Sequence, residues 1–310
     1  MLQRKRAKII MIVICSVIAA VAVAAFALWS YLTSGLNQVK LDTEDLAIVQ
    51  DDSVDQNAWD SIQNIAVFGI DSTEEQASYG DQYRSDLIIV ASIIPEENTV
   101  KLTSILRDSK VPIEGHDPQK INAAYKYGFA PLAIKTLNQN FRLNIQDYVT
   151  IDFAGIEHLV NALGGIEVEL TEEESRQVEG SVPGWNTLDG YQVMLYARIR
   201  KIDSDYYRAS RQQTVISCLF EKIRNTSVLQ MPGMIRELLE CVETSLSYGD
   251  ILKIILSLDI RNLNLVNNTI PDIRYETDLW GGIDRDHGEW VYIYDLDQAA
   301  ERLHQIIYGQ

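Results

Sequence analysis

Five basic side chains lie within fourteen positions of a chain that is otherwise acidic. The protein has 310 residues and a formal net charge of −17 at pH 7, so a local excess of positive charge indicates an anionic ligand. The planar guanidinium group donates two parallel hydrogen bonds to an oxyanion, which makes phosphate the first candidate. The five residues are Arg198, Arg200, Lys201, Arg208 and Arg211.

The second half of this basic cluster falls on a predicted helix. Arg208, Arg211 and Gln212 are three or four residues apart, so we expect them to share one face near the start of a helix over residues 210–224. The first turn of a helix exposes unpaired N–H groups and a partial positive charge. This placement also favours an anion.

Aspartate side chains stand at the ends of predicted strands upstream of the cluster. Asp71 closes the run Gly-Ile-Asp (69–71), Asp86 closes Arg-Ser-Asp (84–86), and Asp108 follows Arg107. Carboxylates at the ends of adjacent strands can hold Mg²⁺, which takes one or two of them together with water and phosphate oxygens. Taken one at a time, such aspartates more often cap turns, and Arg–Asp neighbours usually form surface ion pairs of small energetic value.

Apolar runs and helical spacings alternate along the chain and predict a mixed α/β fold. Runs rich in Ile and Val predict strands, and apolar residues three or four apart predict helices between them. This alternation indicates a mixed central β-sheet covered by helices on both faces. The predicted strands are 62–70, 86–94, 99–105, 148–151, 166–170 and 291–294, and the main predicted helices are 131–140, 152–163, 210–224 and 251–258.

The N-terminal part has the pattern of a membrane anchor. No charged residue occurs from 9 to 37, a length that crosses a bilayer, and the basic run before it predicts an N-terminus in the cytoplasm. A cleaved signal peptide is the alternative, although its apolar region is usually only about 7–15 residues long. We predict a cytoplasmic tail (1–8), a transmembrane signal-anchor (9–32), a linker (33–60) and an extracytoplasmic domain (61–310).

The composition bears on two further questions, namely whether the protein binds nucleic acid and whether disulfides hold its fold. The net acidity argues against a nucleic-acid partner, which would require a basic face. Cys218 and Cys241 are the only cysteines beyond the predicted anchor. They could form one bridge or remain two buried thiols, and no dense disulfide framework is predicted.

Together, the short motifs resemble those of the LytR-CpsA-Psr family. The resemblance covers roughly residues 62–225, and the single predicted anchor agrees with it. The motifs are Gly-Ile-Asp-Ser (69–72), Arg-Ser-Asp (84–86), Ser-Ile-Leu-Arg-Asp (104–108), Lys-Ile-Asn-Ala-Ala-Tyr (120–125), Val-Thr-Ile-Asp-Phe-Ala-Gly (149–155), Leu-Gly-Gly-Ile-Glu-Val (163–168), Leu-Asp-Gly-Tyr-Gln (188–192), Tyr-Ala-Arg-Ile-Arg-Lys (196–201) and Asp-Tyr-Tyr-Arg-Ala-Ser-Arg-Gln-Gln (205–213).

The resemblance implies a phosphotransferase at the bacterial cell membrane. Such an enzyme moves a glycopolymer, for example teichoic acid or capsular polysaccharide, from a polyprenyl-diphosphate carrier to peptidoglycan. It further implies an apolar pocket for the lipid tail and Mg²⁺ (or Mn²⁺) supported by Asp71 and Asp86. As catalytic residues we predict Asp86, Arg107 and Asp108, with Asp86 as the first candidate for general base. The implied diphosphate-binding residues are Arg84, Arg107, Lys120, Arg198, Arg200, Arg208, Arg211 and Gln212.

The chain departs from the family pattern at a few positions, among them Ala197 and Tyr191, which are less usual choices. Leu106 stands where the family usually has proline, and Thr73 where it commonly has arginine. The same site could hydrolyse polyprenyl diphosphates with water in place of a sugar hydroxyl. A non-catalytic envelope regulator or lipid-carrier-binding protein is the other alternative.

Overall fold

The computed structural model describes residues 35–51, 54–70, 83–199, 205–227, 230–272 and 279–309. Asp71, Arg200 and the predicted tail and anchor (1–8 and 9–32) lie outside these ranges. Within them, no helix is both long enough and apolar enough to cross a membrane. The anchor therefore stays a prediction.

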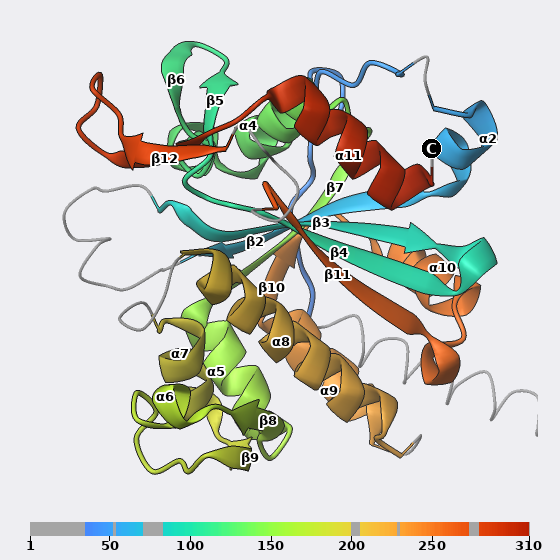
Figure 1. The fold of residues 1–310 in the computed structure, drawn as a ribbon. Coiled ribbons are helices and arrows are strands. Elements are labelled where there is room, and N and C mark those ends of the chain that lie inside the picture. Colours follow the sequence, from blue (N-terminus) through green and yellow to red (C-terminus); the bar gives the residue numbers. More distant parts are fainter. Residues whose placement is uncertain are drawn as a thin grey trace, which may run out of the picture.

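A mixed seven-stranded sheet forms the centre of the described structure (Figure 1). Strands β2 and β7 are parallel, as are β4 and β11, whereas β3 runs antiparallel to both β2 and β4. This confirms the predicted mixed sheet. In spatial order the strands are β1 (Asn37–Gln38), β10 (Val242–Thr244), β7 (Asp147–Asp152), β2 (Gln63–Ile70), β3 (Ser85–Ile94), β4 (Thr99–Ile105) and β11 (Asn264–Ile270).

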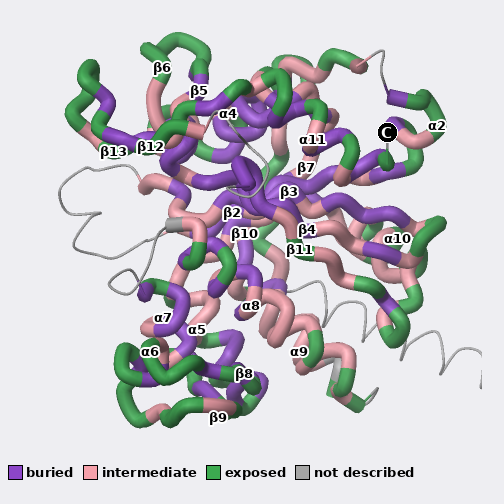
Figure 2. The backbone as a smooth tube through the Cα atoms, viewed as in Figure 1, coloured by how far each residue is buried: buried purple, intermediate pink, exposed green. Residues whose placement is uncertain are grey.

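Helices cover both faces of this sheet because its strands carry apolar side chains on both faces. Phe68 and Val90 belong to a core cluster shared with α4 (Ala123–Phe141) and α11 (Leu296–Tyr308). Ile65 and Ile93 belong to a separate cluster with α10 (Tyr248–Ser257). Figure 2 shows the central strands β2 and β3 as largely buried.

A lobe below the sheet in Figure 1 has a core of its own. Its Val168, Leu188 and Val193 pack with Val215, which belongs to the long helix α8 (Asp205–Arg224). Because α8 also contacts β4 and β11, it joins the lobe to the sheet. The lobe comprises α5 (Phe153–Ala162), β8 (Ile166–Leu170), α6 (Glu172–Ser175), β9 (Gly184–Leu188) and α7 (Gly190–Ala197).

Two hairpins extend from the sheet on the side of α4. They are β5 (Lys110–Ile113) with β6 (His116–Lys120), and β12 (Trp280–Ile283) with β13 (Trp290–Ile293). A parallel bridge between Ser109 and Tyr292 holds them together. Only the last of these strands was predicted from sequence. The remaining described elements are α2 (Gln56–Ser61), α9 (Met231–Glu240) and the 3-10 turns Pro95–Glu97 and Ile260–Asn262.

Some details differ from the sequence predictions. Part of the predicted linker packs on the domain, since β1 pairs with β10 and Leu46 and Val54 lie in the core. Helix α4 begins at Ala123, eight residues before the predicted start, and it is kinked at Gly128 and Phe129. Cys218 and Cys241 are free, half-buried thiols.

Candidate functional site

The loop after β4 places the predicted Arg107 and Asp108. Three backbone hydrogen bonds from distant parts of the chain fix it. Leu106 N donates to Ile270 O (2.8 Å), Asn122 N to Arg107 O (3.3 Å), and Tyr292 N to Asp108 O (2.8 Å). The loop is therefore held by β11, by the start of α4 and by β13, which limits the freedom of the two side chains.

Four of the predicted site residues form one network of alternating charge at this loop. Arg107 Nη1 lies 2.5 Å from Asp86 Oδ1 at the start of β3, and Arg107 Nε lies 3.7 Å from Asp108 Oδ2. Lys120 Nζ, at the end of β6, lies 3.0 Å from Asp108 Oδ1. Asp108 is buried, and the side chains of Arg107 and Lys120 are less than one-fifth exposed. Burial of paired charges in a rigid loop reduces solvent screening, so each charge acts strongly on its neighbours.

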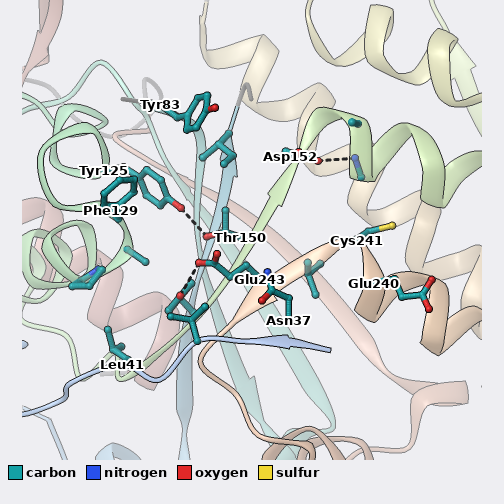
Figure 3. A pocket seen from close by; sticks show the side chains of 18 of the residues that line it. Asn37, Leu41, Tyr83, Tyr125, Phe129, Thr150, Asp152, Glu240, Cys241 and Glu243 are labelled. Carbon is teal, nitrogen blue, oxygen red and sulfur yellow. Dashed lines mark hydrogen bonds between the residues drawn. The ribbon is translucent and has the colours of Figure 1, made fainter. Parts of the chain in front are cut away.

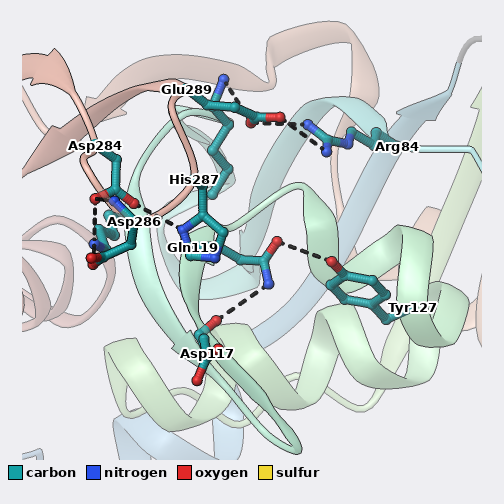
Figure 4. A network of polar contacts seen from close by, with 10 residues as sticks. Arg84, Asp117, Gln119, Tyr127, Asp284, Asp286, His287 and Glu289 are labelled. Carbon is teal, nitrogen blue, oxygen red and sulfur yellow. Dashed lines mark hydrogen bonds and ion pairs between the residues drawn. The ribbon is translucent and has the colours of Figure 1, made fainter.

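Glu289 completes this network, and it was not predicted from the sequence. It precedes β13, and its carboxylate lies 3.3 Å from Arg84 Nη1 and 3.3 Å from Lys120 Nζ (Figure 4). Burial alone would raise the pKa of Glu289, but the hydrogen bond from Arg84 and the charges of Arg84 and Lys120 outweigh it, and the pKa is lowered. We call Arg84, Asp86, Arg107, Asp108, Lys120 and Glu289 the ion-pair network. No sequence spacing pointed to Glu289, because it lies 205 residues after Arg84.

The basic residues of α7 and α8 have separate surroundings. Arg198 caps the C-terminus of α7, and its guanidinium carbon lies 4.0 Å from the centre of the Phe153 ring. Arg208 and Arg211 are buried. Arg211 donates to the Ile199 carbonyl oxygen (2.9 Å) and lies 3.5 Å from Glu174. In this structure Arg211 therefore holds Ile199, which follows the C-terminus of α7, and pairs with Glu174 of α6.

Gln213 positions α8 against the sheet, and it too was missed. Its amide donates to Ser104 Oγ (2.9 Å) and to the Asn268 carbonyl oxygen (2.5 Å). Ser104 belongs to β4 and lies three residues before Arg107. This contact therefore attaches α8, the helix of Arg208 and Gln212, to the strand that leads into the ion-pair network. The half-buried Gln212 is its neighbour on α8.

A cavity of about 920 Å³ lies between the starts of α4 and α5, strands β7 and β10, and residues 37–41 (Figure 3). Its walls are partly aromatic: Tyr125 and Phe129 come from α4, and the Tyr125 hydroxyl lies 3.2 Å from Thr150 Oγ1. Ile70 and Tyr83 also line it, and Tyr83 precedes Arg84 in the chain. Tyr83 therefore links the cavity wall to the ion-pair network along the chain, although no residue of the network lines the cavity itself.

Phe129 reaches this cavity through a strained backbone. Its φ of 52° and ψ of −152° lie in a region that is essentially confined to glycine. The strain follows from the kink in α4, where Gly128 precedes it and Pro131 breaks the helical hydrogen bonding. Strain of this kind persists only where the surroundings impose it, so the packing around the kink keeps Phe129 in the cavity wall.

Comparison with known proteins agrees with the fold and the motifs. A model of the LytR_cpsA_psr family matches residues 29–306. The chain belongs to this family. This confirms the resemblance inferred from the motifs.

Curated LytR-CpsA-Psr relatives resemble the chain at 28–36 % identity. The polyisoprenyl-teichoic acid–peptidoglycan teichoic acid transferase TagU of Enterococcus faecalis is 36 % identical over 64 % of this chain and 66 % of the relative. TagT of Bacillus subtilis, which bears the same enzyme name, is 33 % identical over 53 % of both chains. The regulatory protein MsrR of Staphylococcus aureus is 28 % identical over 79 % of this chain and 76 % of its own. The chain thus spans about half to two thirds of the two transferases.

Solved structures share the fold over most of the domain. The crystal structure of B. subtilis TagT superposes with a TM-score of 0.65 at 24 % identity, covering 87 % of this chain and 99 % of that one. The crystal structure of B. subtilis TagV gives 0.65 at 25 % identity, over 80 % and 97 %. These matches confirm a LytR-CpsA-Psr-like α/β fold with a mixed central sheet.

The described residues fit a Mg²⁺ ion only in part. No group of three or more His, Cys, Asp or Glu side chains in the described ranges is arranged to hold a metal. Of the two predicted ligands, Asp86 is described and Asp71 is not. Asp71 follows Ile70, whose backbone pairs with Ser85, the neighbour of Asp86. Chain connectivity therefore allows two carboxylates from adjacent strands, the number that Mg²⁺ commonly takes.

A buried carboxylate next to the network predicts a pH-dependent contribution to stability. His287 and Lys110 donate hydrogen bonds to Asp284, and they lower its pKa to about 2. In an unfolded chain the value is about 3.9, so the interaction stabilises the fold fully above about pH 4 and is lost as the pH falls towards 2. Unfolding by denaturant should show Asp284→Asn less stable than the wild type at pH 7, with the difference shrinking below about pH 4.

Asp286→Asn is the matched control, because this carboxylate lies in the same loop but is exposed. It should change stability little at any pH. A constant difference between wild type and Asp284→Asn from pH 7 down to pH 2 would contradict this assignment.

Proposed function

We propose that the protein transfers a glycopolymer from a polyprenyl-diphosphate carrier to peptidoglycan. The observation that carries the proposal is the combination of the ion-pair network with the 920 Å³ cavity, whose lining residue Tyr83 directly precedes Arg84 of the network. Such a cavity suits a lipid tail, because most ligand pockets bury an apolar body and fix it with a few polar groups. The basic side chains of the network suit the negatively charged diphosphate.

The names and ligands of relatives support this assignment. TagU and TagT are named polyisoprenyl-teichoic acid–peptidoglycan teichoic acid transferases. One solved structure with this fold, a LytR-CPS2A-psr family protein, contains bound octaprenyl pyrophosphate lipid. We also propose that the N-terminal segment anchors the protein in the membrane and that the domain lies outside the cytoplasm, as the N-terminal sequence predicts.

Residues of the network have distinct proposed tasks. An acceptor hydroxyl attacks the phosphorus nearer the polymer, the new O–P bond forms, and the bond to the bridging oxygen breaks, so that polyprenyl phosphate leaves. Asp86 accepts the hydroxyl proton, since it is more exposed than Asp108. Arg84, Arg107 and Lys120 neutralise the charge that develops on the phosphoryl oxygens and the leaving group.

The α7–α8 side supplies the remaining contacts in this proposal. We assign diphosphate binding to Arg198, Arg200, Arg208 and Gln212, and we assign to Arg211 the task of holding α8 to Ile199 and Glu174. Asp71 and Asp86 would hold Mg²⁺ or Mn²⁺, which neutralises diphosphate charge when bound.

Full-length protein in detergent, mixed with a polyprenyl-diphosphate-linked glycan, tests the proposal. We expect release of polyprenyl phosphate only when both a divalent cation and a peptidoglycan acceptor are present. A chelator should reduce transfer to background, and added Mg²⁺ or Mn²⁺ should restore it. The measurement is the amount of polyprenyl phosphate and of glycan-modified peptidoglycan formed.

Other outcomes separate the alternatives. Release of polyprenyl phosphate without acceptor would favour the hydrolase. Tight donor binding without turnover under any condition would favour a binding or regulatory protein, the role that the name of MsrR expresses for that relative. Absence of donor binding would contradict the proposal.

A further inference from the structure

A second, polar pocket of about 620 Å³ lies where the two hairpins meet α4 (Figure 4). It is distinct from the lipid-sized cavity, with which it shares no lining residue. It is lined by Gly115, His116, Asp117, Gln119, Tyr127 and His287. None of these is an arginine or a lysine, so the pocket lacks the fixed cations that a phosphate or an anionic polymer requires.

Hydrogen bonds and ring stacking fix the side chains of this pocket. The Tyr127 hydroxyl donates to Gln119 Oε1 (3.1 Å), and the Gln119 amide donates to the Asp117 carbonyl oxygen (3.3 Å). The His116 imidazole stacks on the Tyr127 ring, with 3.9 Å between ring centres and 13° between planes. The result is a preorganised surface of amide, phenol, imidazole and carboxylate groups beside aromatic rings. Such groups both donate and accept hydrogen bonds, as a neutral ligand rich in hydroxyl groups requires.

Two chain segments connect this pocket to the ion-pair network. Gln119 immediately precedes Lys120 on β6, and His287 lies two residues before Glu289. His287 Nδ1 lies 3.0 Å from Asp284 Oδ2, and Asp284 Oδ1 lies 2.9 Å from Lys110 Nζ. The turn that carries His287 is therefore anchored to β5. The pocket and the network are therefore neighbours along β6 and along the turn that precedes β13.

We propose that this pocket binds the acceptor, as a subsite for a neutral glycan chain. The inference rests on the proposed transferase function and adds the place where the acceptor sugar is held. The division of charge supports it: the donor, a diphosphate, meets the arginines and Lys120, whereas the uncharged sugar meets Gln119, Tyr127 and His287. Gln119 and Lys120 are consecutive on β6, so a sugar held by Gln119 lies beside the strand that carries one cation of the network.

The probe is an uncharged β-1,4-linked N-acetylglucosamine tetrasaccharide, which carries neither lipid nor phosphate. Calorimetry measures its binding to the full-length protein in detergent. We expect saturable binding by the wild type. Gln119→Ala and Tyr127→Phe should each raise the dissociation constant about tenfold, the value of one lost hydrogen bond of roughly 1.4 kcal/mol. Binding of the polyprenyl-diphosphate donor should not change in either variant.

Matched controls make the same substitutions elsewhere on the surface. Gln177→Ala and Tyr191→Phe alter exposed residues of the lobe and should leave tetrasaccharide binding unchanged. Absence of saturable binding by the wild type, or equal dissociation constants in the pocket variants and the wild type, would overturn the subsite.

A further variant separates this inference from the proposed function. Arg107→Ala should lose donor binding and retain the tetrasaccharide affinity. A wild-type protein that binds the tetrasaccharide and never the donor would contradict the transferase and leave the subsite in place. Loss of tetrasaccharide binding in Arg107→Ala, in a variant shown to be folded, would count against a separate subsite.

Discussion

Replacement of Arg107 by alanine is expected to lower the rate of glycopolymer transfer about 10²- to 10³-fold, the loss typical for one donor aimed at developing charge. Arg107 is central to the ion-pair network because it contacts both Asp86 and Asp108. Its removal takes away a positive charge from the diphosphate. It also leaves two neighbouring carboxylates without the cation between them, which raises the local negative charge where the substrate is itself negative.

The lysine variant separates charge from geometry. Arg107→Lys retains the charge but cannot donate in a fork to two oxyanions, so we expect a rate between those of alanine and wild type. Transfer, donor affinity and melting temperature should be measured for both variants, because a partly buried arginine also contributes to folding.

Arg176→Ala provides the control. This arginine forms an ion pair with Glu172 on the exposed surface of the lobe, and both side chains are about two-thirds exposed. Exposed pairs contribute about 0–1 kcal/mol, so neither rate nor stability should change appreciably. An Arg107→Ala protein with most of the wild-type rate would remove the network from the proposed mechanism.

The central strands could be predicted from the sequence because burial on both faces selects apolar residues at nearly every position. Strands β2 and β3 are buried on both faces, and they therefore read as continuous apolar runs. By contrast, β6 has the sequence His-Asp-Pro-Gln-Lys and is mostly exposed. Such a strand forms because it pairs with β5, and its sequence shows no alternation of apolar and polar residues. The acceptor pocket depends on this hairpin, so the sequence did not reveal it.

The residues of the ion-pair network also differ in whether the sequence could predict them. Arg84, Asp86, Arg107 and Asp108 follow or precede apolar strands, and strand ends that meet at one edge of a sheet place them together. Glu289 reaches the network because the β12–β13 hairpin docks on the loop after β4, for example through the bridge between Ser109 and Tyr292, which are 183 residues apart. A long-range pairing of two short strands has no sequence signature of its own. Gln213 escaped notice for a related reason, because its hydrogen bonds depend on how α8 lies across β4 and β11.

The second large effect is expected at the contact between α5 and α7, where Gly190 begins α7. A Cβ atom there would lie 2.3 Å from the Glu157 carbonyl oxygen and 2.9 Å from Asn161 Nδ2. The Gly190 N–H donates to Asn161 Oδ1 (2.9 Å), so the close approach is held by a hydrogen bond. A backbone oxygen cannot yield to a methyl group, and Gly190→Ala must move α7 away from α5.

We expect Gly190→Ala to destabilise the protein by about 2–3 kcal/mol, at the upper end of the usual cost of overpacking. For a domain of this size the melting temperature should fall by roughly 5–10 °C. Transfer should also decrease below the unfolding temperature, because α7 carries Arg198 at its C-terminus and any shift of the helix displaces that side chain. Thermal and denaturant unfolding measure the first effect, and donor affinity measures the second.

The same substitution at Gly233 should have the opposite sign. Gly233 lies inside α9, and a Cβ atom there would meet no other atom within 4 Å. Alanine in a helix interior is favoured over glycine by about 0.5–1 kcal/mol, so Gly233→Ala should raise stability by that amount and leave transfer unchanged. Because both variants add one methyl group to a helical glycine, their difference isolates the contact between α5 and α7. Equal stabilities of the two variants would show that α7 can move away from α5 without loss, and the positioning of Arg198 would then need another cause.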